Sequence, residues 1–168
     1  MSRPLANDYP AYFEGYISKV QADSITAIMD KYNDALISFY TNLPASKADF
    51  AYAAGKWTLK DVLQHIIDTE RIMAYRLLRV ARNDNTPLAS FDENSYATNA
   101  NAGERSFEAI KEEFLAVRKS TDLLLLSLQP EQLEYAGIAS GNRVTANALV
   151  YIIFGHMLHH QSVIEERY

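Results

Sequence analysis

A chain of 168 residues, 48% of them hydrophobic, is long enough to bury a core, and its 6 glycines and 5 prolines are too few for a turn-rich β-sandwich. The chain has no cysteine, which excludes disulfides, thiolate metal sites and a cysteine nucleophile. A formal net charge of −5 argues against a nucleic-acid partner, because such binding needs a basic surface.

The hydropathy pattern favours a cytoplasmic location. Residues 1–8 contain one arginine with no long apolar run behind it, so they do not resemble a signal peptide. The longest apolar stretch, residues 148–154, is far shorter than the roughly 20 residues that cross a membrane. We therefore expect no membrane partner.

Four long segments carry hydrophobic residues spaced by three or four positions, which predicts four helices. They span about residues 24–43, 58–82, 106–128 and 145 to near the C-terminus, and a shorter helix is expected around 11–20. Pro44 and Pro130 end the first and third helices. Thr58 and Asp61 resemble a capping box at the start of the second.

Four helices of about 20 residues or more predict an all-α four-helix bundle, and no linker or repeat divides the single domain expected over residues 1–168. No segment alternates with period two for long, so strands are not expected. The connection over about 83–105 is long enough to cross the full ~35 Å length of a bundle. The second and third helices are therefore expected to run parallel.

All four histidines fall in two of the predicted helices: His65 in the second, and His156, His159 and His160 in the fourth. At about 100° per residue, His156 and His160 project from one face, into an apolar stripe where an unpaired polar group is costly. His65 lies at a similar height if these two helices are antiparallel. The three imidazoles together predict a site for one divalent metal ion.

Residues near these histidines are open to two interpretations each. His159 is favoured as a partly exposed histidine or an outer partner over a fourth ligand. Asp61 and Asp68 could orient the His65 ring, or could be solvated helix carboxylates. Four residues of the long connection could cover the site, or could only fix the conformation of the connection itself. They are Asp92, Glu93, Asn94 and Tyr96.

Three blocks of the sequence occur in an order typical of one family. They are Trp57–His65 followed by Asp68–Arg71, then Phe91–Tyr96, then Gly155–His160 running on to Tyr168. Over roughly residues 23–168 the chain thus resembles the DinB-like family of metal-dependent proteins. The resemblance implies an up-down-down-up four-helix bundle, a metal-binding triad of His65, His156 and His160, and a homodimer.

The resemblance implies less about the reaction. Some relatives are S-transferases or isomerases that use bacillithiol or mycothiol, so the first hypothesis is a metalloenzyme that uses a low-molecular-weight thiol on a small-molecule substrate. Metal-dependent hydrolysis is the alternative. A non-enzymatic stress-response protein that binds metal or a small molecule is a further hypothesis, and a structural dimerisation bundle without metal is the last.

The ligand set restricts the metal only in part. Three imidazoles leave a coordination position open, as in catalytic sites, and permit zinc, nickel, copper, iron or manganese. Zinc and nickel are expected first. Because the chain has no cysteine, any thiol must come from a bound cofactor, and no residue is assigned as catalytic from the sequence.

Overall fold

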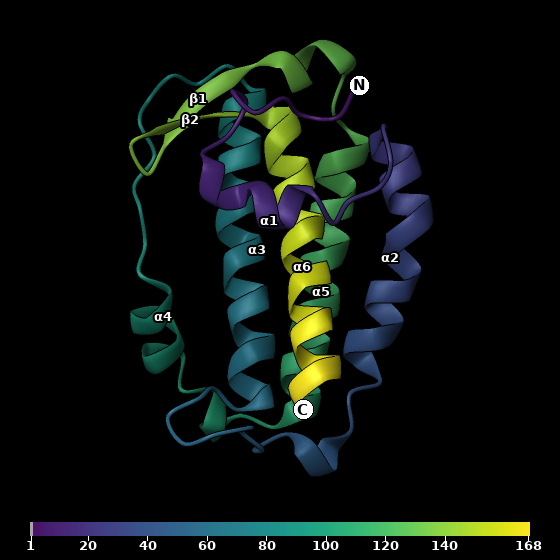
Figure 1. The fold of residues 1–168 in the computed structure, drawn as a ribbon, viewed down its shortest axis with the longest axis vertical. Helices are drawn as coiled ribbons and strands as arrows, with labels where there is room; N and C mark the ends of the chain where they lie inside the picture. The colour runs from purple at the N-terminus through teal and green to yellow at the C-terminus, as the bar shows by residue number, and fades with distance from the viewer. Residues whose placement is uncertain (1) are drawn as a thin grey trace.

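The computed structural model describes residues 2–168, and four long helices dominate it (Figure 1). They are α2 (Ile25–Thr41), α3 (Leu59–Ala81), α5 (Phe107–Leu126) and α6 (Ala146–Arg167). A 3-10 turn, Ala11–Phe13, and the short α1 (Glu14–Ile17) precede them. All five predicted helical segments are confirmed, with ends within a few residues of those expected.

Side-chain caps begin each long helix. Ser24, Ser106 and Thr145 each accept a hydrogen bond from the backbone N–H three residues further on. Thr58 does the same, and the Asp61 carboxylate accepts a hydrogen bond from the Thr58 N–H at 2.9 Å. Each cap satisfies an N–H that the helix leaves unpaired, and the predicted capping box is confirmed.

The helices form a four-helix bundle in which α3 and α5 run parallel, while α2 and α6 run in the opposite direction (Figure 1). α3 packs against α5 and α6, and α2 packs against the same two helices. Between α3 and α5 the chain returns along the outside of the bundle, through α4 (Glu93–Ala100) and the 3-10 turn Ala102–Glu104. This return confirms the up-down-down-up topology and explains the length of the connection.

The first half of α6 is enclosed by α3, α2 and α1. Apart from the half-buried Asn147, every residue from 146 to 157 is buried. Even so, no helix within residues 2–168 combines the length and apolar character needed to cross a membrane. α1 crosses α6 at Gly155, where an added Cβ would overlap the carbonyl oxygen of Tyr16. This close approach requires glycine, and it places Tyr16 beside His156.

The expectation of no strands is wrong at one place. β1 (Ala136–Ala139) and β2 (Asn142–Thr145) form an antiparallel hairpin. The turn residues Ser140 and Gly141 have φ values of +53° and +76°, as a two-residue hairpin turn of the primed type requires. Four-residue strands are too short to show a period of two, although the Ser-Gly dipeptide is a turn signal.

A charged cluster lies inside the bundle. Arg118 of α5 is 1% exposed and donates hydrogen bonds to Glu70 of α3, at 2.8 Å, and to Asp122. Asn33 of α2 donates to Asp122 at 2.8 Å, so the cluster joins three helices. Burial raises the pKa of Glu70, and the Arg118 charge opposes that shift. Glu70 belongs to one of the three sequence blocks quoted above, and here it joins α3 to α5 through Arg118.

Candidate metal centre

The side chains of His65, His156 and His160 meet between α3 and α6. Nε2 of His156 lies 3.0 Å from Nε2 of His65 and 3.1 Å from Nε2 of His160. One ligand nitrogen from each ring lies within 4.8 Å of the other two. His65 and His156 are buried and His160 is half-buried. The antiparallel packing of α3 against α6 therefore brings the three rings to one level of the bundle.

The three nitrogens have the chemistry and spacing of a metal ligand set. Imidazole nitrogens bind zinc at about 2.0–2.1 Å, which places two ligands of one tetrahedral ion about 3.3–3.4 Å apart, a few tenths of an ångström more than the distances here. Burial lowers the pKa of His65 to about 4 and that of His160 to about 3, and it takes the pKa of His156 well below its usual value. All three rings are therefore neutral at pH 7. Two facing ring nitrogens are satisfied either by a hydrogen bond, where one of them carries the proton, or by a cation that binds both lone pairs. Three ring nitrogens gathered at one place fit a site for a cation.

Aromatic side chains fix the orientation of two of the rings. Trp57 lies against His65, with ring centroids 4.8 Å apart. The ring of Tyr16 meets that of His156 edge to face, at 5.4 Å and 88°. The hydroxyl of Thr69 lies 3.5 Å from Nδ1 of His65, at the limit of a hydrogen bond. Packing thus contributes more than hydrogen bonding to holding these imidazoles in place.

His159 lies outside the three-nitrogen cluster. It is half-buried, and its ring centroid lies 5.3 Å from that of Tyr16 and 5.0 Å from that of His160. The buried Nδ1 of His160 has no hydrogen-bond partner within residues 2–168. The position of His159 fits the favoured interpretation, a partly exposed histidine that packs beside a ligand.

The two carboxylates of α3 that were candidates to orient His65 serve the helix instead. Asp61 completes the cap with Thr58. Asp68 accepts a hydrogen bond from the Gln64 side chain at 3.1 Å. Of the two interpretations of these residues, the structure supports helix carboxylates.

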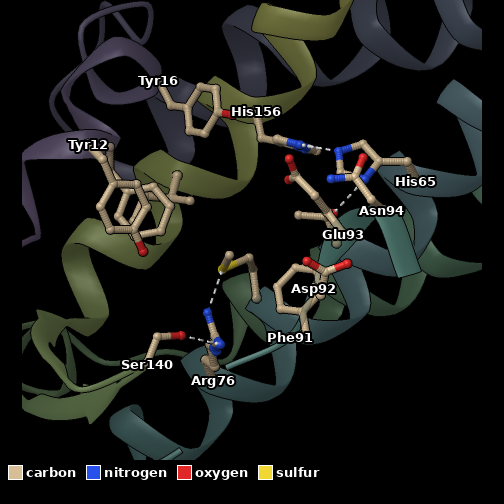
Figure 2. A pocket seen from close by; sticks show the side chains of 14 residues that line it. Tyr12, Tyr16, His65, Arg76, Phe91, Asp92, Glu93, Asn94, Ser140 and His156 are labelled. Atoms are coloured by element: carbon tan, nitrogen blue, oxygen red, sulfur yellow. Dashed lines mark hydrogen bonds between the residues drawn. The ribbon is translucent and has the colours of Figure 1, made fainter. Parts of the chain in front are cut away.

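A pocket of about 460 Å³ opens beside the histidines (Figure 2). His65 and His156 lie at one end, and Arg76 of α3 and Ser140 of the hairpin turn lie at the other. Tyr16 stands beside His156 on the wall formed by α1 and α6. This volume falls within the range of sites for small molecules.

Three of the four candidates in the long connection cover this pocket. Asp92, Glu93 and Asn94 line it, and the carboxylate of Glu93 points toward the histidines (Figure 2). Tyr96 does not line it, and instead packs on Phe91 with ring centroids 5.3 Å apart. The start of α4 therefore forms a wall of the site.

A second pocket, of about 420 Å³, reaches the cluster from another side. His160, His159 and Trp57 line it together with Arg167 near the end of α6. Asn94 lines both pockets. The histidine cluster is therefore accessible from two cavities.

The far end of the first pocket was not predicted from the sequence. Four residues of α3 that line the pocket are separated by successive steps of four, four and three residues, so they share one helix face: His65, Thr69, Met73 and Arg76. The charge of Arg76, on the same helix face as the candidate ligand His65, could have indicated this end of the pocket. Ser140 gave no comparable signal, because its approach to Arg76 depends on the hairpin.

Comparisons with known proteins agree with this fold. The chain resembles YfiT from Bacillus subtilis, described as a probable metal-dependent hydrolase with an unusual four-helix bundle topology. The identity is 18% and the TM-score 0.65, over 79% of this chain and 83% of that one. It also resembles the DinB-like protein YjoA from Bacillus subtilis, with 15% identity and a TM-score of 0.58 over 84% and 87% of the two chains. At these identities the likeness shows the fold alone.

The family is shown by the sequence itself. No curated protein matches the chain. The sequence model that describes the DinB superfamily does match, over residues 29–164, which include all three clustered histidines. The chain therefore belongs to the DinB superfamily.

Proposed function

We propose that this protein is an enzyme that uses one divalent metal ion, held by His65, His156 and His160, to act on a small-molecule substrate. The observation that carries the proposal is the convergence of three neutral imidazole nitrogens beside a pocket. Three histidine ligands leave a position of the ion free, which is the arrangement of catalytic sites. When bound, the ion would act as a Lewis acid and lower the pKa of a water or thiol at that position.

Side chains of the pocket would supply the proton transfer. The carboxylate of Glu93 points toward the histidines from an exposed position at the start of α4. Burial raises the pKa of Tyr16, and the nearby charge of Glu93 raises it further. The Tyr16 phenol therefore stays protonated at neutral pH and can donate a hydrogen bond. Glu93 would hold or move a proton, and Tyr16 would orient the substrate.

Thiol-dependent transfer is the reaction we place first. Two pockets reach the histidine cluster, which gives room for two substrates, one of them a low-molecular-weight thiol. Metal-dependent hydrolysis is the second candidate, because the structurally similar YfiT is described as a probable hydrolase of that kind. Hydrolysis needs only one organic substrate, so the second pocket would then have no role.

An activity screen tests the proposal. Protein purified without an affinity tag is analysed for bound metal and then loaded with zinc or nickel. It is assayed with electrophiles and low-molecular-weight thiols, and separately with esters and amides. We expect turnover that chelation removes and added metal restores, and Glu93→Gln should lower kcat while metal content stays unchanged. Absence of metal-dependent turnover in both panels would contradict an enzyme and favour a metal-binding protein.

Removal of the metal should lower the thermal stability without unfolding the protein. The buried apolar core extends over all four long helices and does not depend on an ion. An ion present at 100 times its Kd stabilises the native state by about 2.7 kcal/mol, which corresponds to a fall in Tm of roughly 5–10 °C on chelation. Far-UV circular dichroism should show unchanged helical signal at 25 °C. Loss of most of that signal would mean that the ion is structural, as in a zinc finger.

A further inference from the structure

The pocket contains a buried arginine at the end opposite the histidines. Arg76 is 4% exposed. Its Nη2 donates to the carbonyl oxygen of Ala89 at 2.8 Å and to the hydroxyl of Ser140 at 2.9 Å. Its Nη1 reaches only the weak acceptor Sδ of Met73, at 3.8 Å. These acceptors are all neutral, and no carboxylate within residues 2–168 pairs with this guanidinium.

The other deeply buried arginine shows how this fold compensates such a charge. Arg118 faces the carboxylates of Glu70 and Asp122, which are themselves buried. An unpaired charge away from water is costly, so buried charges are normally paired. Arg76 differs from Arg118 in lining a cavity. The negative charge that Arg76 lacks is therefore expected from a molecule that enters the cavity.

The surrounding backbone holds the guanidinium in place. Leu88 donates to the carbonyl of Ile138 at 2.8 Å, and the N–H of Ser140 donates to the carbonyl of Leu88 at 3.0 Å. These bonds tie the segment after α3 to the hairpin and bring the Ala89 and Ser140 oxygens to the same nitrogen of Arg76. Because the Ser140 hydroxyl accepts from Arg76, its own hydrogen remains available to a ligand. The left-handed backbone at Ser140, which glycine or asparagine adopts more readily, here carries a hydroxyl into the pocket.

The two ends of the pocket are separated by a distance suited to one small molecule. Arg76 follows His65 by eleven residues, or about 16 Å along the helix axis. The side chains that extend into the cavity shorten that gap. Figure 2 shows Tyr12 on the side of the pocket opposite Phe91, with its hydroxyl directed toward the side of Ser140. A ligand can therefore contact Arg76 while another part of it reaches the histidines.

The charges around the pocket select the orientation of such a ligand. Glu93 places a carboxylate near the histidines, and Asp92 places a second one on the same wall. The Glu93 carboxylate repels an anion at the histidine end, whereas Asp92 lies beside Phe91 between the two ends and caps α4 through Ser95. Burial lowers the pKa of Arg76, yet a guanidinium remains charged at neutral pH. In protein without a bound ion, negative charge is thus favoured at the Arg76 end.

We propose that the pocket binds a small molecule through an oxyanion, either a carboxylate or a phosphate, which pairs with Arg76 and accepts hydrogen bonds from Ser140 and Tyr12. The reacting group of the same molecule then lies at the histidines. This second statement rests on the proposed function. The pairing of an oxyanion with Arg76 does not, and can be tested alone.

An NMR titration tests the pairing in the wild-type protein. The probes are butyrate, the neutral butyramide of similar size, and inorganic phosphate. The protein is used both as purified and after chelation, because an anion could also bind a metal ion. We expect butyrate or phosphate to shift the Nε–H resonance of Arg76 in both forms, and to bind at least about tenfold more tightly than butyramide. A stronger response to butyrate identifies a carboxylate site, and a stronger response to phosphate identifies a phosphate site.

Matched variants separate Arg76 from general charge effects. Arg76→Gln should weaken anion binding by about tenfold or more, and Arg76→Lys should retain part of it. Arg82→Gln removes the same charge from the exposed C-terminal end of α3 and should leave binding unchanged. Circular dichroism checks the fold of Arg76→Gln, since this side chain also joins α3 to the hairpin. The wild-type titration decides the question if that variant does not fold.

Three results would overturn the proposal. They are equal binding of butyrate and butyramide, equal weakening by Arg76→Gln and Arg82→Gln, and anion binding that disappears on chelation. The last would place the anion at the histidines. Failure of the proposed metal-dependent reaction would leave the titration of chelated protein unaffected, so the two failures are distinguishable.

Discussion

Replacement of His65, His156 or His160 by alanine will abolish tight metal binding, whereas His159→Ala will leave the metal content near that of the parent. Each of the first three residues supplies one of the ring nitrogens that meet between α3 and α6. His159 is the matched control, because it lies on α6 beside His156 and His160 with its ring outside the cluster. Loss of one ligand should lower the metal affinity by more than the roughly 10–100-fold that follows loss of a residue that only orients a ligand.

The metal content of the four variants would be measured by elemental analysis of untagged protein, and the affinity by calorimetry after chelation and reloading. Circular dichroism would confirm that each variant is folded. Equal losses from all four substitutions would show that His159 is also a ligand. Unchanged metal content in His65→Ala would place the ion elsewhere than between α3 and α6.

Arg118→Ala will lower the free energy of unfolding by about 3–5 kcal/mol, because it leaves two carboxylates in the interior without their counter-charge. Glu70 and Asp122 are 4% and 7% exposed, and Oε2 of Glu70 already has no hydrogen-bond partner in the described chain. The expected fall in Tm is roughly 6–20 °C. Thermal and urea denaturation followed by circular dichroism would measure it. Arg82→Gln, an exposed control, should change the stability by no more than about 0.5 kcal/mol.

A combined variant separates lost charge pairing from lost packing. Arg118→Met together with Glu70→Gln and Asp122→Asn removes all three charges while keeping similar volumes. It should be more stable than Arg118→Ala, since neutral groups cost less to bury than unpaired carboxylates. If Arg118→Ala proved as stable as the parent, the two carboxylates would have to be compensated by other groups.

The sequence by itself determined the helices and the level of the candidate site. Hydrophobic spacing and the caps at Ser24, Thr58, Ser106 and Thr145 act within one or two helical turns, so they are readable without knowledge of the fold. The long connection after α3 indicated the parallel pair through its length alone. The heights of His65, His156 and His160 along antiparallel helices then placed the three rings together.

Only the tertiary structure decided what the polar residues around that cluster do. Arg76 and Arg118 look alike in the sequence, as single arginines in amphipathic helices. Arg118 pairs with Glu70, 48 residues away, whereas Arg76 lines a pocket beside Ser140, 64 residues away. The hairpin that carries Ser140 depends on pairing between strands too short to show a pattern. These contacts join distant parts of the chain, and their free energy comes from burial and charge pairing that no local spacing records.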